Sequence, residues 1–413
     1  TDAQAVEVTV SNVIPVITPP GDQTSNEGSN ATFDLGSFTD AGDDAPWSVN
    51  IDWGDGSTDA AFNVGAAGDI TDQAHTYADD GEYIVTINLT EEDGTGAAAT
   101  QRTVKITVAN VAPTVTLAAA NDLTVDEGEQ RTYAFSVSDP GADTFTVVSV
   151  SCGDDGAQVG TTLTTADGGS FVCAFADGDE SSDIAVQVKD DSDALSNLAS
   201  QTVVIANVAP IITAPAGQSA DEGSSTLFDL GSFTDPGADA PWAVSIDWGD
   251  SSLATTFSVT TPGTITGQSH EYADNGTYTV TISLVEDGGL GTPAAEETFT
   301  VTVANIAPTI AASGDATSNE GATYTLTLGS VSDPGDDTVT SWSIDWGDDS
   351  APSTGIGSPA GTTPTHVYAD GPDSHTITVS LTDEDGTFTG ASLGVSVLNV
   401  APTVAFTAGD TSV

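Results

Sequence analysis

The residues that could do chemistry in this sequence are its carboxylates, 62 Asp and Glu against 4 Lys and Arg, which give a formal net charge of -58. Carboxylate oxygens bind hard cations such as Ca²⁺, and a pair of carboxylates can also hydrolyse glycosidic bonds. A glycosidase needs one shaped cleft, whereas these acids recur on short turns along the whole chain. The pattern therefore favours cation binding and predicts no enzyme and no catalytic residue.

The charge also restricts the partners. Nucleic acids and anionic membranes are bound through clustered Lys and Arg, which this chain lacks, so neither is an expected partner. No stretch reaches the roughly 18 apolar residues that a membrane span requires. So many carboxylates repel one another unless salt screens them or cations lie between them, which indicates a saline habitat, divalent cations or both.

One short phrase, Asn-Val-Ala-Pro or a close variant, divides the chain into repeats. Its Asn stands at positions 12, 110, 207, 305 and 399, at spacings close to the roughly 100 residues of an immunoglobulin-like sandwich. Four whole repeats fit between these positions. The predicted boundaries are residues 1–11 (last strand of a preceding repeat), 12–109 (repeat 1), 110–206 (repeat 2), 207–304 (repeat 3), 305–398 (repeat 4) and 399–413 (first strand of a following repeat).

The apolar residues between the turns alternate with polar ones. Tyr83, Val85, Ile87 and Leu89 are typical, and this period of two predicts half-buried strands. Gly or Pro interrupts most longer windows, so no helix is expected. The predicted fold is all-β: four tandem Greek-key immunoglobulin-like β-sandwiches that form an elongated array.

Three segments carry a family resemblance: Ile51 to Ser57, Ile246 to Ser251 and Ile344 to Ser350, each with Trp-Gly-Asp followed by a His-x-Tyr corner. They resemble the W-x-F-G-D-G signature of polycystic-kidney-disease (PKD) domains, although Trp stands where the family often has Phe. The resemblance implies a module of prokaryotic surface proteins, S-layers, adhesins and secreted hydrolases, with no catalytic residue. It implies an extracellular or cell-surface location.

Repeat 2 departs from its neighbours at two aligned positions. Cys152 stands where repeat 1 has Trp53, and Cys173 stands where it has His75. If Trp and His face each other in the other repeats, the two Cys lie close enough for a disulfide. Such a bond contributes about 3 kcal/mol and indicates an oxidising compartment. Two buried thiols and a zinc site are the alternatives.

Acidic turns are expected to meet where one sandwich follows another. The linker Asn, the Asp-Pro-Gly turn and the acidic hairpin lie at one end of each repeat, and the Asx-Glu-Gly turn lies at the other, with Asp55 and Asp79 as further candidates in repeat 1. The chemistry predicts calcium at these junctions. The predicted ligands are Glu27, Asn110, Asp139, Asp143, Asp190 and Asp191 at the first junction, Glu127, Asn207, Asp235, Asp239, Glu286 and Asp287 at the second, and Glu222, Asn305, Asp333, Asp337, Glu384 and Asp385 at the third. Asn12, Asp40, Asp44, Glu92 and Asp93 are expected to face a preceding repeat.

The alternative interpretation of these acids is that they are solvated turn residues, because Asp and Asn are favoured in turns for their own backbone hydrogen bonds. On the calcium interpretation the chain is a structural or adhesive surface fibre, filament, stalk or S-layer-like subunit stiffened at its junctions. The alternative function is a non-catalytic spacer or glycan-binding accessory of a secreted hydrolase. The expected partners are neighbouring repeats or copies, as in a homopolymer, and a surface glycan.

Overall fold

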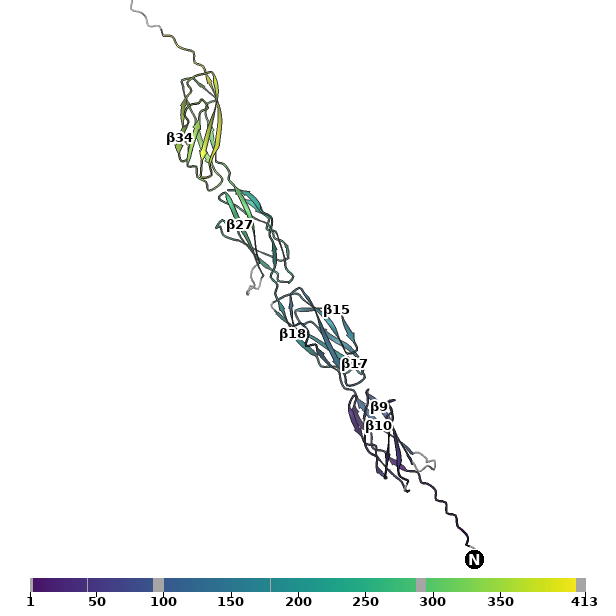
Figure 1. The fold of residues 1–413 in the computed structure, drawn as a ribbon. Coiled ribbons are helices and arrows are strands. Elements are labelled where there is room, and N and C mark those ends of the chain that lie inside the picture. Colours follow the sequence, from purple (N-terminus) through teal and green to yellow (C-terminus); the bar gives the residue numbers. More distant parts are fainter. Residues whose placement is uncertain (1–2, 43, 92–99, 179, 287–294, 406–413) are drawn as a thin grey trace, which may run out of the picture. The chain divides into compact units, whose positions relative to one another are not determined.

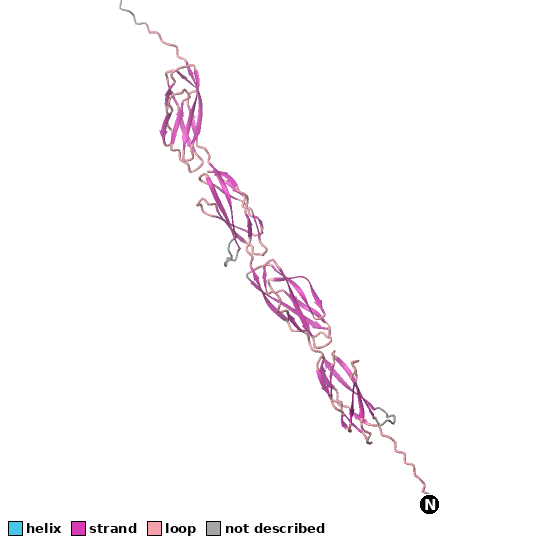
Figure 2. Cartoon of the chain, in the orientation of Figure 1, coloured by secondary structure: helices cyan, strands magenta, loops and turns pink. Residues whose placement is uncertain are grey.

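The computed structural model describes residues 3–42, 44–91, 100–178, 180–286 and 295–405. Every regular element in these ranges is a β-strand, and none of them forms a helix (Figure 2). The chain divides into two units, the first comprising residues 1–208 and 236–238 and the second residues 209–235 and 239–413.

Repeat 1 belongs to the first unit and has three sheets. Their strand orders are β1-β4-β7, β2-β10-β9-β5-β6 and β3-β8; β9 and β10 are marked in Figure 1. The strands are β1 (Val16–Thr18), β2 (Gln23–Asn26), β3 (Asn30–Phe33), β4 (Ser37–Thr39), β5 (Trp47–Asp52), β6 (Ala60–Val64), β7 (Gly68–Asp69), β8 (Gln73–Thr76), β9 (Gly81–Glu91) and β10 (Thr100–Ala109).

Repeat 2, also in the first unit, has two four-stranded sheets. Their orders are β11-β13-β16-β15 and β12-β18-β17-β14. The strands are β11 (Thr114–Leu117), β12 (Thr124–Asp126), β13 (Gln130–Ser138), β14 (Phe145–Ser151), β15 (Gly156–Thr165), β16 (Gly168–Phe175), β17 (Glu180–Asp190) and β18 (Ala199–Ala206).

Repeat 3, in the second unit, has the same three-sheet plan as repeat 1. The orders are β19-β22-β25, β20-β28-β27-β23-β24 and β21-β26. The strands are β19 (Ile211–Thr213), β20 (Gln218–Asp221), β21 (Thr226–Phe228), β22 (Ser232–Thr234), β23 (Trp242–Asp247), β24 (Thr255–Val259), β25 (Gly263–Thr264), β26 (Gln268–His270), β27 (Gly276–Glu286) and β28 (Ala295–Ala304).

Repeat 4, in the second unit, keeps the five-stranded sheet. The orders are β29-β32, β30-β37-β36-β33-β34 and β31-β35. The strands are β29 (Thr309–Ser313), β30 (Thr317–Asn319), β31 (Thr323–Thr325), β32 (Thr327–Ser332), β33 (Ser341–Asp345), β34 (Ser353–Ile356), β35 (Thr365–Val367), β36 (Asp373–Thr382) and β37 (Thr387–Leu398).

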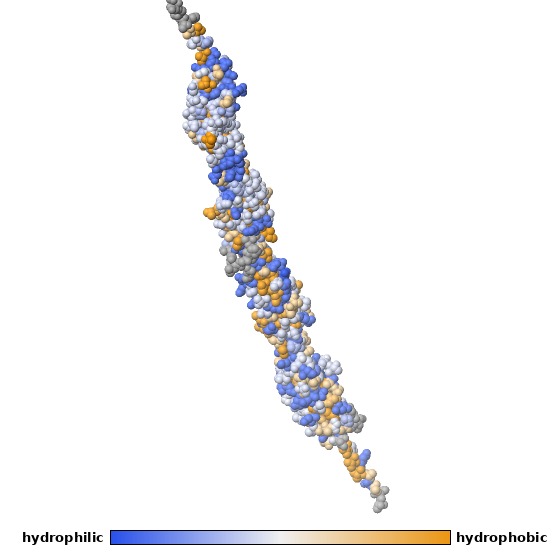
Figure 3. Space-filling model, turned by 60° about the vertical axis from the view of Figure 1, so that its left-hand side comes forward, coloured by the Kyte–Doolittle hydropathy of each residue, from blue (hydrophilic) through white to orange (hydrophobic). Residues whose placement is uncertain are grey.

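Each repeat has its own hydrophobic core, as the alternating pattern predicts. In β9, Val85, Ile87 and Leu89 are fully buried while the residues between them are partly exposed. This is the arrangement of a strand with one face on a core. In contrast, Val6, Val8 and Val10 before β1 are exposed, and orange atoms mark this segment in Figure 3.

Repeat 2 differs from the others in the pairing of the strand that follows its Cys-Gly-Asp turn, the counterpart of the Trp-Gly-Asp turn in repeat 1. In repeat 1 that strand, β6, pairs with β5 in the five-stranded sheet. In repeat 2 the corresponding strand, β15, pairs instead with β16 in the opposite sheet. The strand equivalent to β5, which is β14, therefore has β17 as its one sheet neighbour among the described strands. Within the described part of the chain no helix long and apolar enough to cross a membrane was found.

Candidate metal centre

A buried carboxylate, that of Glu27, lies at the end of repeat 1 that meets repeat 2. Because β2 pairs in parallel with β10, Glu27 follows β2 at the same end of the sandwich at which β10 ends and the linker begins. The linker amide of Val111 donates to Glu27 Oε1 at 2.6 Å. Glu27 is only 1% exposed, and its second oxygen, Oε2, has no hydrogen-bond partner among the described residues. A buried carboxylate oxygen without a partner is energetically costly unless a cation contacts it.

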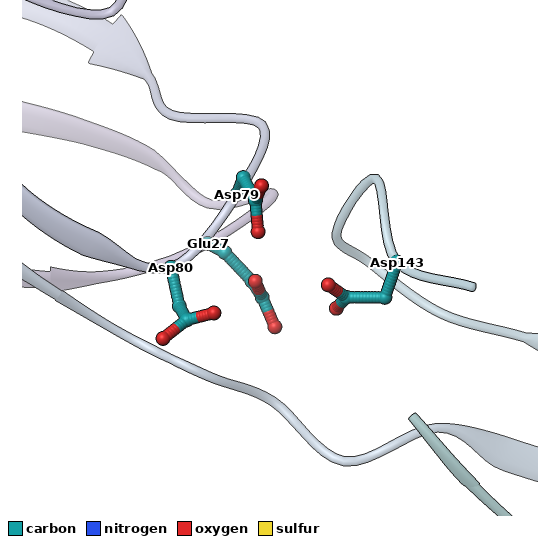
Figure 4. A group of neighbouring side chains, drawn as sticks. All are labelled: Glu27, Asp79, Asp80 and Asp143. Atoms are coloured by element: carbon teal, nitrogen blue, oxygen red, sulfur yellow. The ribbon is translucent and has the colours of Figure 1, made fainter. Parts of the chain in front are cut away.

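Three other carboxylates gather around Glu27. Asp79 and Asp80 come from the corner after β8 in repeat 1, and Asp143 comes from a loop of repeat 2 and points toward Glu27 (Figure 4). One oxygen from each of the four residues lies within 4.8 Å of the others. We call Glu27, Asp79, Asp80 and Asp143 the spanning group, because it includes residues of both repeats. Ca²⁺ takes oxygen ligands at 2.3–2.6 Å, so a group of this size fits around one ion.

Backbone contacts hold the two repeats together at this point. The amide of Ala142 donates to the carbonyl oxygen of Ala78 at 2.6 Å, and the Ser192 hydroxyl donates to Asp80 Oδ1 at 3.0 Å. Gly28 adopts a φ of +60°, and a Cβ at this position would lie 2.1 Å from the carbonyl oxygen of Pro140. Glycine is thus required twice over, by its backbone conformation and by the approach of repeat 2.

A second acidic group lies within repeat 2. Asp139, Asp143 and Asp190 each place an oxygen within 4.8 Å of the others. Asn110 of the linker donates through Nδ2 to Asp190 Oδ2 at 3.0 Å, and Asn110 Oδ1 is buried with no partner in the described structure. We call such a set, drawn from one repeat, an intra-repeat group. Asp143 belongs to both groups.

Repeat 1 has its own intra-repeat group, formed by Asp40, Asp44 and Glu91. Glu91 is 4% exposed; its Oε2 accepts a hydrogen bond from Asn12 at 2.5 Å, and Oε1 has no partner in the described ranges. The indole Nε1 of Trp47 donates to Asp40 Oδ2 at 3.1 Å.

The junction within the second unit repeats this construction. Glu222 is fully buried, its Oε1 accepts from the linker amide of Ile306 at 2.5 Å, and its Oε2 has no hydrogen-bond partner in the described residues. Glu222, Asp274 and Asp337 form the spanning group. The amide of Asp336 donates to the carbonyl oxygen of Ala273 at 2.8 Å, as Ala142 does to Ala78.

Acids of repeat 4 border this second spanning group. Asp383 is 6% exposed, and its Oδ2 has no hydrogen-bond partner within the described ranges; the same holds for both oxygens of Asp333 and of Asp337. Asn305 of the linker donates to Asp385 Oδ2 at 2.9 Å, and Glu384 Oε2 accepts from the amide of Thr338.

Burial and mutual repulsion disfavour the charged forms of these carboxylates. Burial, followed by repulsion from Glu27, raises the pKa of Asp143 to about 7. Burial, followed by repulsion from Glu222, raises the pKa of Asp337 to about 7. Burial also raises the pKa of Glu27, although the Val111 hydrogen bond opposes the rise.

The few basic side chains are engaged elsewhere. Lys105 pairs with Glu82 and Lys189 with Asp193. Arg131 contacts Asp122 and Glu129, and Arg102 donates to the carbonyl oxygen of Gln101. In the described ion pairs, therefore, no Lys or Arg offsets the charge of the acidic groups, which fits a cation as their missing partner.

The structure distributes the predicted ligands unevenly. At the first junction Glu27, Asn110, Asp139, Asp143 and Asp190 come together, and Asp191 Oδ2 accepts from Thr144 at their edge. Asp55 instead contacts His75 within repeat 1. Sequence reasoning missed Asp80, Asp274, Glu91 and Asp383. Glu91 joins Asp40 and Asp44 in the group where the sequence predicts Glu92 and Asp93. The latter two residues and Asp287 lie outside the described residues.

The predicted ligands of the second junction belong to different units. Glu127 is buried, and its Oε1 accepts from the amide of Val208 at 2.8 Å. Asp235 Oδ2 accepts from Trp242 Nε1 at 2.9 Å, and Glu286 is buried at the end of β27. Asn207 and Asp239 also lie within the described ranges. A calcium site at this junction stays a prediction.

The cysteines form the predicted disulfide, Cys152 to Cys173, with a Cα separation of 5.7 Å. At the matching place in repeat 1 the rings of Trp53 and His75 stack, with their centroids 4.4 Å apart. Both cysteines are buried in the core of repeat 2.

The tryptophans offer no platform for a sugar. Five of them, Trp47, Trp53, Trp242, Trp248 and Trp346, are at most 3% exposed, and Trp342 is half-buried against its core. Among the described residues no aromatic side chain stands exposed as a stacking surface.

The chain was compared with known sequences and solved structures. No match was found among curated protein sequences. Solved structures with a similar fold include the N-cadherin EC1-4 fragment of Drosophila (12% identity, 92% of this chain and 99% of that one, TM-score 0.24) and the tetra-tandem repeat from the extending region of a large adhesion protein (16%, 90% and 96%, TM-score 0.39). Titin domains I67-I69 are a third (11%, 71% and 100%, TM-score 0.30).

The fold is that of a tandem array of immunoglobulin-like β-sandwiches. The PKD domain model matches residues 12–108, 207–303 and 305–397, which together are more than half of the chain. The chain therefore belongs to the PKD domain family, as its Trp-Gly-Asp segments predict. These matches correspond to repeats 1, 3 and 4, the copies that have the Trp and His pair and the five-stranded sheet.

Proposed function

We propose that the chain is a structural or adhesive extracellular repeat protein whose repeat junctions bind calcium and are stiffened by it. The observation that carries this proposal is the buried carboxylate of Glu27. Its Oε2 has no hydrogen-bond partner among the described residues. Asp143 of the next repeat points toward Glu27 (Figure 4). The same arrangement recurs at Glu222.

Calcium suits these groups better than magnesium does. The ligands come from short loops of two repeats, and Ca²⁺ accepts six to eight oxygens in a flexible geometry, whereas Mg²⁺ demands a strict octahedron. An ion held by residues of both repeats restricts the hinge between them. Stability then increases with calcium by linkage, by about 2.7 kcal/mol per site at a concentration 100-fold above Kd.

An extracellular location is part of the proposal. The Cys152–Cys173 disulfide supports it, because disulfides persist in oxidising compartments. Free calcium outside cells also allows occupancy of loop sites of modest affinity. The function proposed is presentation and mechanical support, with no catalytic step.

The test is thermal unfolding and small-angle scattering of the whole chain in EGTA and in millimolar calcium at constant ionic strength. We expect calcium, and not matched sodium, to raise the Tm and to narrow the distribution of inter-repeat angles. The variant Glu27→Gln/Glu222→Gln should lose most of this response. A charge-matched control, Asp59→Asn/Asp167→Asn, alters two exposed acids and should keep it. Identical curves with and without calcium would show that the acids are solvated turn residues.

A further inference from the structure

The acids at the first junction gather as two groups rather than one. The spanning group contains Glu27, Asp79, Asp80 and Asp143, and the intra-repeat group contains Asp139, Asp143 and Asp190. Ligand oxygens on one Ca²⁺ lie at most about 5 Å apart, twice the Ca–O distance. In each group the candidate ligand oxygens lie within 4.8 Å of one another, which satisfies this limit, and the two groups share only Asp143.

We propose that this junction binds two calcium ions and that Asp143 bridges them. This inference rests on the proposed function, namely that the junction binds calcium at all. One ion belongs to the spanning group and couples the two repeats. The other belongs to the intra-repeat group and orders the loop from which Asp143 reaches across the junction.

The charge balance favours two ions over one. Six carboxylates, from Glu27, Asp79, Asp80, Asp139, Asp143 and Asp190, lie in the two groups, and no described ion pair brings a Lys or Arg to them. One Ca²⁺ compensates two of these charges and leaves four crowded at partly buried positions. A second ion compensates two more, which is worth most where water is excluded.

Partnerless oxygens are present in both groups. In the spanning group, Glu27 Oε2 is buried without a hydrogen-bond partner. In the intra-repeat group the same is true of Asp139 Oδ2, and Asn110 Oδ1 beside it is a further ligand of the kind that calcium prefers. Asp143 Oδ2, from the shared residue, also has no partner in the described structure.

Gly141 permits Asp143 and Glu27 to approach each other. A Cβ at Gly141 would lie 2.7 Å from both the carboxyl carbon of Glu27 and Asp143 Oδ2. The Asp-Pro-Gly turn of repeat 2 thus brings the shared carboxylate against the buried glutamate of repeat 1. Gly335 has the same place beside Glu222 and Asp337 in the second unit.

The intra-repeat group of repeat 1 shows that such a group forms without a carboxylate from a neighbouring repeat. Asp40, Asp44 and Glu91 all belong to repeat 1. Glu91 is more than nine-tenths buried, and its Oε1 has no partner among the described residues. An intra-repeat ion is therefore a property of the single sandwich, and the spanning ion is added when two sandwiches meet.

Counting bound ions tests the proposal. The intact chain is dialysed against calcium at a concentration that saturates it, and the bound calcium is measured by elemental analysis and by native mass spectrometry. Asp80→Asn removes a ligand of the spanning group alone but can still accept the Ser192 hydrogen bond. Asp139→Asn removes a ligand of the intra-repeat group alone but can still accept from the amide of Gly141.

We expect Asp80→Asn and Asp139→Asn each to lose one ion, and Asp143→Asn to lose two. A loss of only one ion in Asp143→Asn, with no further loss in the triple variant Asp80→Asn/Asp139→Asn/Asp143→Asn, would overturn the bridged pair while leaving the proposed function intact. An intact chain that binds no calcium would overturn both. If Asp143→Asn does not fold, the double variant Asp80→Asn/Asp139→Asn decides: two ions lost supports the pair, and one contradicts it.

Discussion

The indole ring of Trp53 lies flat on the imidazole ring of His75, with ring centroids 4.4 Å apart and an interplanar angle of 2°. His75 Nε2 is 2.7 Å from Asp55 Oδ2, and the Tyr77 hydroxyl donates to the carbonyl oxygen of Trp53. Repeats 3 and 4 have the same stack at His270 and His366. The stack links the turn after β5, in one sheet, to β8, in another sheet. In repeat 2 the disulfide makes the equivalent link.

The aspartate that contacts the stacked histidine, Asp348 in repeat 4, should make the fold sensitive to acid. Burial alone raises the pKa of Asp348, but hydrogen bonds from Ser350 and His366 outweigh it and lower the pKa to about 2, below its ordinary 3.8. A carboxylate with a lowered pKa contributes stability above the unfolded value, and this contribution is lost as the pH falls from about 4 to 2.

Asp348→Asn should therefore destabilise repeat 4 by about 1–3 kcal/mol at pH 7, because it removes hydrogen bonds to a charged group. The difference in unfolding free energy from the unmodified chain should shrink as the pH falls to 2. Calorimetry across this range measures it, with the exposed Asp167→Asn as the control. A difference that stays constant with pH would contradict the assignment.

Gly28 provides a test of the contact between repeats 1 and 2. Gly28→Ala should uncouple the repeats, because the new Cβ would lie 2.1 Å from the carbonyl oxygen of Pro140. Gly321 is the matched control: its φ is +72° and a Cβ there meets nothing within 4 Å. Both substitutions cost about 1–2 kcal/mol of backbone strain.

Hydrogen exchange at the Ala142 amide, which donates to the carbonyl oxygen of Ala78, reports the contact directly. We expect Gly28→Ala to lose protection there and Gly321→Ala to retain it. Equal protection in the two variants would show that the contact does not depend on Gly28.

The disulfide should stabilise repeat 2 alone. Reduction, or Cys152→Ser/Cys173→Ser, should destabilise it by about 3 kcal/mol through the entropy of the unfolded chain. Because the chain has only two Cys, reductant should leave the unfolding of the other repeats unchanged. Asp154 stands at the position of Asp55, so Cys152→Trp/Cys173→His restores all three members of the stack. Recovered stability that no longer responds to reductant would confirm that the two devices are equivalent.

The sequence was sufficient for the features that depend on local pattern. Period-two alternation predicted the buried faces of strands such as β9, and the aligned positions of Cys152 and Cys173 predicted their bond. The partner of β15 could not be predicted, because a strand with turns on both sides can pair with either sheet. That choice depends on tertiary packing.

The members of the acidic groups that were missed show a similar limit. Glu91 belongs to the acidic hairpin that the sequence places at residues 91–94, but the ligands predicted there were Glu92 and Asp93, and the structure makes Glu91 the last residue of β9. Its side chain is buried and accepts a hydrogen bond from Asn12. Asp274 belongs to the Tyr-x-Asp corner of repeat 3, and Asp80 directly follows that of repeat 1. Only the approach of the next repeat distinguishes these two acids from the many exposed ones.

Trp47 should report on an ion in the intra-repeat group of repeat 1, with Trp53 as its control. Trp47 Nε1 donates to Asp40 Oδ2 at 3.1 Å, so an ion drawing on Asp40 changes the field at the buried indole. Trp53, in the stack with His75, has no such contact with an acidic group in the described structure. Calcium should therefore shift the fluorescence of Trp47 and leave that of Trp53 unchanged. Trp47→Phe should abolish the repeat 1 component of the signal, whereas Trp53→Phe should keep it. A calcium response that survives Trp47→Phe at full amplitude would place the ion away from Asp40.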